Sequence, residues 1–343
     1  MPLPKSLGRR LLIGVLFGVA VYAGILIWAD LGAVLGAVRE LPLWVLPTAC
    51  ALSLCNYVVR FWKWQRYCQL LGIRLERRTS FLIYLSGLTM SVTPGKMGEV
   101  FKSWLVRKVT GVRISESAPI VVAERFTDLL GYLILVAIGG LSTEPEFGWI
   151  FWSMLAVCVV ALVLVGSEHF ARLCVAAVAK APVVSRLAPR VEIAFGSTRK
   201  LLALREMFGP TLVSVIGWGL ECTGFWLIAN QIVPDGLPYL YAVFAFAFSA
   251  VIGAVALIAP GGLGVTEFSL GRLIVKRIGP DGIGSSALGL TLEVARQKAA
   301  GMTILARLCT LWFAVFVGFV ATALFTRQYG EVEDEPDEDA ARA

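Results

Sequence analysis

Histidine is nearly absent from this sequence, which has only His169 among its 343 residues. A single histidine cannot form a histidine-rich metal site, and we interpret it as an interfacial residue. The seven cysteines lie mostly in apolar segments and include no CxxC pair, so they predict neither a zinc site nor a disulfide framework. The sequence also has no nucleotide-binding P-loop. We therefore expect no metal, no cofactor and no direct use of ATP.

Charged residues are also scarce, at 16% against roughly 25% in ordinary soluble domains. Apolar residues make up 57% and fall in long uncharged blocks, which argues against a soluble α/β enzyme. The composition excludes wholesale disorder, collagen-like repeats and secreted disulfide scaffolds. Four blocks of about 19–21 residues can each cross a hydrocarbon core roughly 30 Å thick, namely Leu11–Ala29, Leu41–Val59, Phe147–Ser167 and Leu308–Thr326. The sequence therefore predicts an all-α polytopic integral membrane protein.

The charge is divided between a basic body and an acidic C-terminal tail. The formal net charge is +7, but the residues after Gly330 hold seven acids and one base. Removing them leaves 30 basic and 17 acidic residues, about +13. These bases lie in loops beside apolar blocks, where positive-inside topology explains them better than nucleic-acid binding does. We expect one transmembrane domain over residues 1–326 and a disordered acidic tail over 327–343.

The N-terminus predicts the location and orientation of the chain. Lys5, Arg9 and Arg10 precede the first apolar block, which is longer than the 7–15-residue core of a signal peptide. We therefore expect this block to be retained as a membrane anchor. The basic residues before it predict a multi-pass protein with a cytoplasmic N-terminus.

The distribution of charge predicts about six to eight membrane-spanning segments with two re-entrant hairpins. Residues 79–95 are uncharged but lie between two basic stretches, which a hairpin would keep on the same side. Residues 236–266 are uncharged and too long for one helix, so 240–259 is either a full span or one arm of a second hairpin. The remaining spans are expected near 11–29, 42–61, from Ser115 or Ser117 to Gly140, 147–167, 210–230 and 303–326.

Two glycine-proline turns indicate an internal repeat. Both read Pro-Gly-x-x-Gly followed by a glutamate, at Pro94–Glu99 and Pro260–Glu267. If each half has three crossings and one hairpin, the halves have opposite orientation, as in inverted-repeat transporters. We place repeat one near 10–140 and repeat two near 147–326, with an insertion around Gly279–Ala300. The inverted arrangement puts three bases on the outer side, whereas a full span at 240–259 would keep them inside: Arg272, Lys276 and Arg277.

Ionisable residues inside apolar segments are the candidate functional residues, because uncompensated charge at membrane depth is costly. Glu221 is the only charge between Met207 and Pro234, so it is functional or makes a packing hydrogen bond. Glu124 and Asp128 share a helix face and require a cation, which Arg60 or Arg307 could supply better than Arg125. Simple snorkelling near helix ends is the alternative.

The two turns carry their own candidates. Glu99 and Glu267 either compensate the positive end of the half-helix that follows each turn, or form part of an anion site there. Thr93 fits an N-cap with Pro94 at the first helical position, and Lys96 would add positive charge. The cluster at 60–66 alternates aromatics and bases, which is typical of an interfacial belt or of a headgroup entrance.

Together these motifs resemble the transmembrane region of lysylphosphatidylglycerol synthases, a flippase-like membrane family that also occurs without the synthase domain. The resemblance covers about residues 10–326 and is carried by Arg60-x-x-Lys63-Trp64, Pro94-Gly95-x-x-Gly98-Glu99, Glu124-Arg125-x-x-Asp128, Pro260-Gly261-Gly262-Leu263-Gly264-Val265-x-Glu267 and Arg307. It implies movement of lipids, often with anionic or modified headgroups, between leaflets. We expect the form without the soluble synthase domain, and the stretch Gly279–Ala300 departs from the compact pattern expected before Arg307.

The leading hypothesis is therefore an inner-membrane lipid transporter of the flippase type, with no catalytic residues. The expected partners are membrane lipids with an anionic or polyprenyl-phosphate headgroup, a second copy of the chain and a lipid-modifying enzyme, but no nucleic acid. The alternatives are a membrane transferase that uses a lipid-linked substrate, or a non-transporting partner of envelope lipid synthesis. The expected substrate-binding residues are Arg60, Pro94, Gly95, Lys96, Gly98, Glu99, Glu124, Arg125, Asp128, Glu221, Pro260, Gly261, Gly262, Gly264, Glu267 and Arg307.

Overall fold

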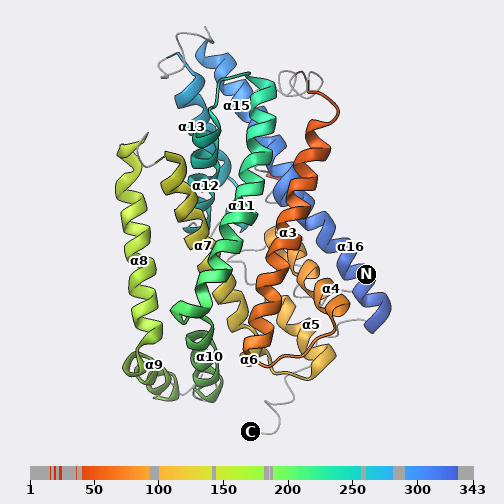
Figure 1. Cartoon of the computed structure of the whole chain (residues 1–343), viewed down its shortest axis with the longest axis vertical. Helices are drawn as coiled ribbons and strands as arrows, with labels where there is room; N and C mark the ends of the chain where they lie inside the picture. Colours follow the sequence, from red (N-terminus) through yellow and green to blue (C-terminus); the bar gives the residue numbers. More distant parts are fainter. Residues whose placement is uncertain are drawn as a thin grey trace.

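The computed structural model describes residues 41–92, 100–140, 144–180, 188–255, 260–280 and 290–330, with a few single residues elsewhere. All regular structure in these ranges is helical, and the helices form an elongated bundle (Figure 1). This confirms the all-helical part of the expected fold class, whereas the two re-entrant hairpins and the inverted repeat remain predictions. The longer helices are α3 (Val45–Leu70), α7 (Pro119–Gly140), α8 (Gly148–Gly166), α11 (Leu204–Ile232), α12 (Tyr239–Val255), α15 (Leu292–Arg307) and α16 (Phe313–Tyr329).

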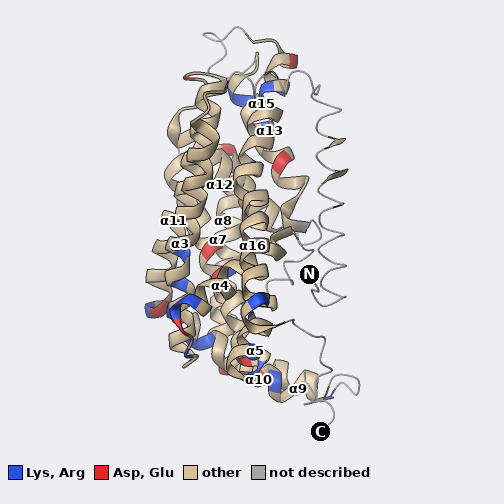
Figure 2. Cartoon of the chain, turned by 90° about the vertical axis from the view of Figure 1, so that its right-hand side faces the viewer, with Lys and Arg blue, Asp and Glu red and all other residues tan. Residues whose placement is uncertain are grey.

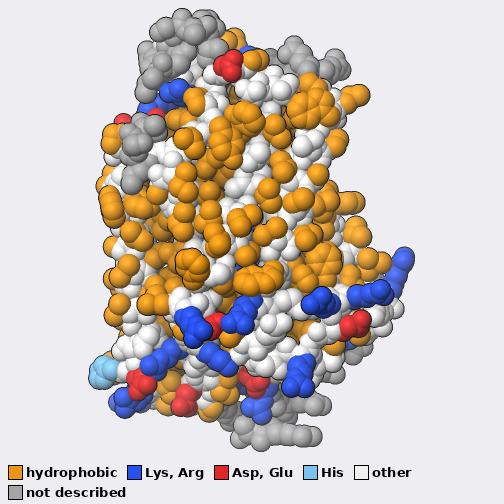
Figure 3. Space-filling model, viewed as in Figure 1, with side chains coloured by type: hydrophobic (Ala, Val, Ile, Leu, Met, Phe, Trp, Pro, Cys, Tyr) orange, Lys and Arg blue, Asp and Glu red, His pale blue; other side chains and the backbone are white. Residues whose placement is uncertain are grey.

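Four helical stretches in the described residues are long and apolar enough to cross a membrane, namely Val45–Leu70, Pro145–Gly166, Leu204–Ile232 and Leu292–Tyr329. Large apolar side chains on the bundle surface are exposed, and Figure 3 shows them over most of one face, with charged side chains gathered at the lower end. Such a surface suits lipid rather than water. The span expected near 11–29 and the tail after Gly330 lie outside the described residues.

The last span differs from the prediction. It was expected near 303–326, after a polar stretch, but helix α15 begins at Leu292 and includes Glu293, Arg296 and Lys298. Their charge does not prevent a helix, because α15 packs against its neighbours α11 and α13 and Lys298 donates to the Ile232 carbonyl. The expected insertion at Gly279–Ala300 is therefore helical from Leu292 on, while residues 281–289 lie outside the described part.

The centre of the bundle is formed by α3, α7, α11 and α12, and glycines let these helices approach closely. A Cβ at Gly131 of α7 would lie 2.8 Å from Ser214 Cβ on α11. Likewise, a Cβ at Gly217 of α11 would lie 3.1 Å from Arg60 Cδ on α3. Small residues at helix contacts are common in membranes, where association depends on close packing. This packing holds the polar faces of α3, α7 and α11 against one another.

Helices α4 (Arg77–Gly87) and α5 (Phe101–Thr110) lie side by side in the lower half of the molecule (Figure 1). The short helix η1 (Leu88–Val92) follows α4, and the link to α5 lies outside the described residues together with Pro94, Gly95, Lys96, Gly98 and Glu99. Gly87 at the end of α4 adjoins Lys102 at the start of α5, with a Cβ there only 2.5 Å from Lys102 Cγ. Both helices therefore have their inner ends together.

Helices α12 and α13 (Val265–Ile278) form a second pair, in the upper half of the molecule (Figure 1). Between them, η5 (Pro260–Gly262) and Gly264 make a turn in which Gly261, Gly262 and Gly264 have φ of 59°, 70° and 83°. Residues with a Cβ rarely adopt these angles, which explains the glycines of this motif. A Cβ at Gly261 would lie 2.8 Å from the Ser91 carbonyl, so this turn touches η1 of the first pair.

Charged residues lie mainly in the lower half of the bundle and at its upper end (Figure 2). At one end, α13 is tied to the loop between α7 and α8, because Lys276 contacts both Glu144 and Glu146. At the other end, helices α9 (Glu168–Lys180) and α10 (Ala188–Leu201) follow α8, and α6 (Ile114–Ser117) precedes α7. The acidic loop and the end of α13 therefore lie on the same side of the molecule.

This arrangement predicts which introduced cysteines react from the same side of the membrane. In a background without the native cysteines, Arg77→Cys and Lys108→Cys should label from one side, because α4 begins and α5 ends at the same end of the bundle. Asp235→Cys and Pro280→Cys should label from the other side; all four positions are exposed. Membrane-impermeant maleimide labelling in spheroplasts and inverted vesicles measures this. Labelling of positions 77 and 108 from opposite faces would contradict the arrangement.

Candidate functional site

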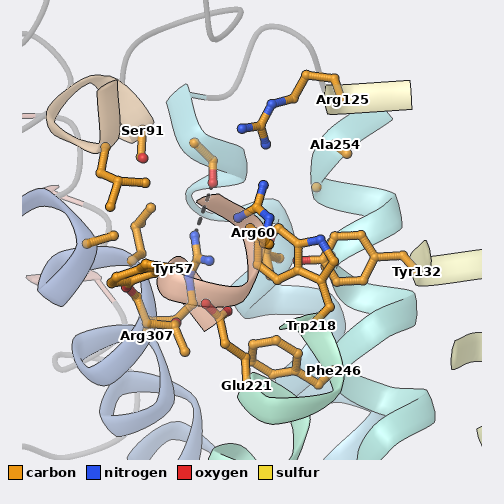
Figure 4. Close-up of a pocket in the computed structure, with 18 residues that line it drawn as sticks. Tyr57, Arg60, Ser91, Arg125, Tyr132, Trp218, Glu221, Phe246, Ala254 and Arg307 are labelled. Carbon is orange, nitrogen blue, oxygen red and sulfur yellow. Dashed lines mark hydrogen bonds between the residues drawn. The ribbon is translucent and has the colours of Figure 1, made fainter. Parts of the chain in front are cut away.

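A cavity of about 120 Å³ lies where α3, α7, α11, α12 and α15 meet the two turn segments (Figure 4). At roughly 30 Å³ per water, its volume corresponds to about four waters or a small polar group. Ser91 of η1 and Gly261 of η5 both line it, so it lies beside the contact between the two turns. Its ionisable lining among the described residues consists of Tyr57, Arg60, Arg125, Tyr132, Glu221 and Arg307.

Asp128 of α7 is the centre of a buried polar network. Its Oδ2 receives a hydrogen bond from Arg60 Nη2 at 2.5 Å, and its Oδ1 one from Lys63 Nζ at 2.6 Å. Ser214 and Trp218 of α11 also donate to Oδ1, at 2.9 Å and 3.1 Å. Removing one partner of a buried ion pair costs about 3–5 kcal/mol, because a charge then remains without compensation. Asp128 therefore joins α3, α7 and α11 in the interior of the bundle.

Glu124 lies one turn before Asp128 but pairs with a different helix. Its Oε2 accepts from Lys102 Nζ of α5, and both side chains are buried. From the sequence, Arg60 or Arg307 was the cation expected for these two acids. Arg60 contacts Asp128, whereas Lys63 and Lys102 are cations that sequence reasoning missed. The spacing of Lys63 three residues after Arg60, on the same helix face, is the signal that could have found Lys63.

The snorkelling and aromatic-belt interpretations of residues 60–66 do not describe Arg60, Lys63 or Trp64. The Arg60 side chain is 5% exposed and that of Lys63 is 0% exposed, so neither reaches the interface. Trp64 is fully buried and donates to Ser80 Oγ, while Trp62 is half exposed. In this cluster, hydrogen bonds to buried partners on α7 and α4 replace contact with water. Arg66 behaves as an interfacial base, paired with Glu206 at 2.7 Å.

Glu267 joins the second turn to Arg307. Its Oε2 accepts from the Gly264 backbone N–H at 2.7 Å, which compensates the start of α13 as the sequence suggested. Its Oε1 accepts from Arg307 Nε at 2.6 Å, and Arg307 Nη2 donates to the Gly261 carbonyl at 3.1 Å. Glu267 therefore holds the Arg307 side chain in place, and Arg307 in turn stabilises the turn at Gly261. Of the predicted glycines here, Gly261 lines the cavity, whereas Pro260, Gly262 and Gly264 form the turn itself.

Glu221 lies halfway along α11 and is 5% exposed. Its Oε1 accepts from Asn56 Nδ2 at 2.6 Å, and it lines the cavity with Arg60 and Arg307. Asn56 of α3 gave no signal in the sequence, because a single asparagine in an apolar span resembles a packing residue.

Three guanidinium groups from three helices share this cavity, and Figure 4 shows them converging with Glu221. Arg60 lies against the Trp218 ring, 4.4 Å from its centroid, and Trp218 stacks on Tyr132 at 4.6 Å. Arg125 Nη1 lies 3.5 Å from Asp128, and its side chain is 33% exposed. Planar guanidinium groups bind phosphate or carboxylate oxygens in a bidentate manner. In the part of the chain that the structure describes, no three His, Cys, Asp or Glu side chains could hold a metal ion.

Asp128→Ala should lower the stability of the protein by about 3–5 kcal/mol, because Arg60 and Lys63 would lose their buried carboxylate. The apparent melting temperature in detergent measures this effect. The matched control is Glu168→Ala on α9, whose carboxylate pairs with Arg199 at the exposed surface and should not matter. Equal melting temperatures for the two variants would refute the central role of Asp128.

Gly261→Ala should also destabilise the protein. The new Cβ would lie 2.8 Å from the Ser91 carbonyl, and a left-handed backbone costs an alanine roughly 1–2 kcal/mol. Gly271→Ala on α13 is the control, because its Cβ would meet no atom within 4 Å and alanine favours a helix. The melting temperature should fall for Gly261→Ala and stay level or rise for Gly271→Ala. The same behaviour in both variants would exclude the contact between the turns.

Comparison with known families agrees with the motifs that line and surround this cavity. The family described as the lysylphosphatidylglycerol synthase TM region matches residues 15–318. This range includes every residue expected at the site. No curated protein matches the chain. The match covers most of the sequence, and the chain therefore belongs to the family of lysylphosphatidylglycerol synthase transmembrane regions.

Proposed function

We propose that this chain is an inner-membrane lipid transporter of the flippase type, which moves a lipid with an anionic or modified headgroup between leaflets. The observation that carries the proposal is the polar cavity among apolar helices. Its three arginines come from α3, α7 and α15, and carboxylates hold two of them in place. An anion that leaves water needs such compensation throughout its path across a low-dielectric core.

The proposed architecture is an inverted repeat. We assign α4, η1 and α5 as one re-entrant hairpin and α12, η5 and α13 as the other, entering from opposite sides. Their placement in opposite halves of the bundle supports this, as does the close approach of Gly261 to Ser91. Turns of broken helices at a repeat interface form the substrate sites of many secondary transporters. In this proposal the substrate site of this kind is the cavity, which is lined by residues of both turns.

The proposed orientation follows the positive-inside rule. The end of the bundle that contains the start of α4, the end of α5 and helices α9 and α10 would face the cytoplasm. The acidic contacts Glu144 and Glu146, with Lys276, would then lie on the outer side. This keeps the N-terminus cytoplasmic, as the basic residues before the first apolar block predict.

In this proposal the headgroup and the tails of the lipid follow different routes. Arg60, Arg125 and Arg307 hold the headgroup in the cavity, while the acyl or prenyl tails remain in the membrane against the exposed apolar surface. The carboxylates Glu124, Asp128 and Glu267 position cations rather than line the cavity themselves. The protein makes and breaks no covalent bond of the lipid.

The arginine that tests this most cleanly is Arg125, since its side chain is partly exposed and Arg60 and Lys63 also hold Asp128. Arg125→Ala should reduce leaflet exchange by at least about tenfold, equivalent to roughly 1.4 kcal/mol, as expected for one lost charged hydrogen bond. Arg307→Ala should have a similar or larger effect. Arg125→Lys should retain part of the activity, because the charge remains but the planar fork is lost. Arg327→Ala, exposed near the end of α16, is the control.

The measurement is exchange of fluorescent phosphatidylglycerol or polyprenyl phosphate in proteoliposomes, with phosphatidylcholine for comparison. Lipid recovered afterwards should be chemically unchanged by mass spectrometry. Exchange that is insensitive to both arginine changes would refute the cavity as the headgroup site. A headgroup altered by the purified protein, and left intact by the arginine variants, would replace the transporter with a membrane transferase.

A further inference from the structure

Glu221 differs from every other buried carboxylate that the structure describes. Five acidic side chains are buried in these ranges. Four of them contact a cation, namely Glu124 with Lys102, Asp128 with Arg60 and Lys63, Glu144 with Lys276, and Glu267 with Arg307. Among the described residues, Glu221 makes no ion pair and instead faces a neutral amide. A buried carboxylate without a cation is in the environment that favours binding a proton.

Asn56 can serve Glu221 in both protonation states. Its Nδ2 donates to Glu221 Oε1 at 2.6 Å, which suits the ionised carboxylate. Its Oδ1 is buried and has no hydrogen-bond partner within the described ranges. Rotation of the amide by half a turn would present Oδ1 to a protonated Glu221, because an amide carries a donor and an acceptor of nearly the same shape. Gly217 leaves room beside this oxygen, where a Cβ would lie only 2.4 Å away.

The groups around Glu221 connect its proton to the occupancy of the cavity. Arg60 and Tyr57 line the cavity with Glu221 from α3, Tyr132 from α7 and Arg307 from α15, while α12 presents the apolar Phe246. The Asp128 carboxylate acts on Glu221 from behind Arg60. An anion that binds Arg60, Arg125 and Arg307 would offset the positive field of these arginines at Glu221. Protonation of Glu221 then becomes easier, and by reciprocity protonation favours the anion. Lowering the pH should therefore strengthen binding of the anionic headgroup.

We infer that Glu221 is a proton-binding site of the central cavity, and that lipid movement is coupled to a proton carried on this carboxylate. In each cycle Glu221 takes one proton from water on one side and returns it to water on the other, so no other reactant is needed. This inference rests on the lipid transport proposed above and names its coupling ion.

The first test detects the proton directly and needs no lipid. Difference infrared spectra of the purified protein between alkaline and acidic buffer should contain the carbonyl band of a protonated, buried carboxylic acid. The band should disappear in Glu221→Gln and remain in Glu206→Gln, which changes a partly exposed carboxylate near the start of the same helix. A wild-type spectrum without this band, or a band that persists in Glu221→Gln, would overturn the assignment.

The second test measures coupling in proteoliposomes with labelled phosphatidylglycerol and polyprenyl phosphate, at clamped membrane potential. A gradient of one pH unit should drive up to about a tenfold difference between leaflets for each proton coupled to the transport of one lipid. In Glu221→Gln, any exchange down the lipid gradient should be insensitive to the pH gradient, whereas Glu206→Gln should behave as wild type. Wild-type exchange that ignores the pH gradient, or follows a sodium gradient instead, would refute proton coupling.

The outcomes of the two tests separate this inference from the proposed function. If no lipid is exchanged under any condition, lipid transport and its coupling both fall, while the infrared band still decides whether Glu221 binds a proton. If lipid is exchanged without a response to pH, transport stands and the coupling falls. Size-exclusion profiles of each variant distinguish these results from misfolding.

Discussion

Compensation of buried charge is the constraint on which the interior of this protein depends. Asp128 shows it most clearly, since its two oxygens accept from two cations and two neutral donors on α3 and α11. Together with Asp128 on α7, the contacts involve three helices, so the network can form only when these helices pack in one register. Buried charged groups lower the stability of the interior when they lack partners, and the need for those partners therefore also determines how the helices pack. Glycines such as Gly131 and Gly217 allow the approach that the network requires.

The buried carboxylates and the arginines have different roles. Asp128 and Glu267 form ion pairs with Arg60 and Arg307, whose guanidinium groups line the cavity. For the anionic headgroup proposed above, such a site would need little reorganisation on binding, because its charged groups are already oriented. Glu221 differs from these two carboxylates, since it faces the cavity itself and accepts a hydrogen bond from the Asn56 amide. Glu221 therefore lines the cavity directly and does not form an ion pair that holds an arginine in place.

Much of this arrangement could be predicted from the sequence, for reasons that also explain the misses. Uncharged runs determine where helices cross a membrane, and ionisable residues within such runs indicate polar positions, so Glu221, Asp128 and Arg307 could be selected in advance. Arg60 was one of the two cations expected for Asp128, and it contacts that carboxylate. The other partners could not be assigned, because Arg307 meets Glu267 and Asn56 meets Glu221 only through tertiary packing. Lys102 resembled part of a basic loop, yet it is buried against Glu124. The start of α15 was missed because three charged residues concealed a helix that its neighbours stabilise.

The stretch from Leu292 to Tyr329 has a mechanical consequence. It is nearly one helix, but the five residues Leu308–Trp312 form a π-helical turn directly after Arg307. Above this turn α15 packs against α13, and below it α16 packs against α4 and η1. A π-turn shifts the helix face that follows it and is a weak point of the hydrogen-bond ladder. The segment therefore has one arm against α13 and the other against α4 and η1, so that a bend at the π-helical turn would shift these two packing partners relative to each other about Arg307.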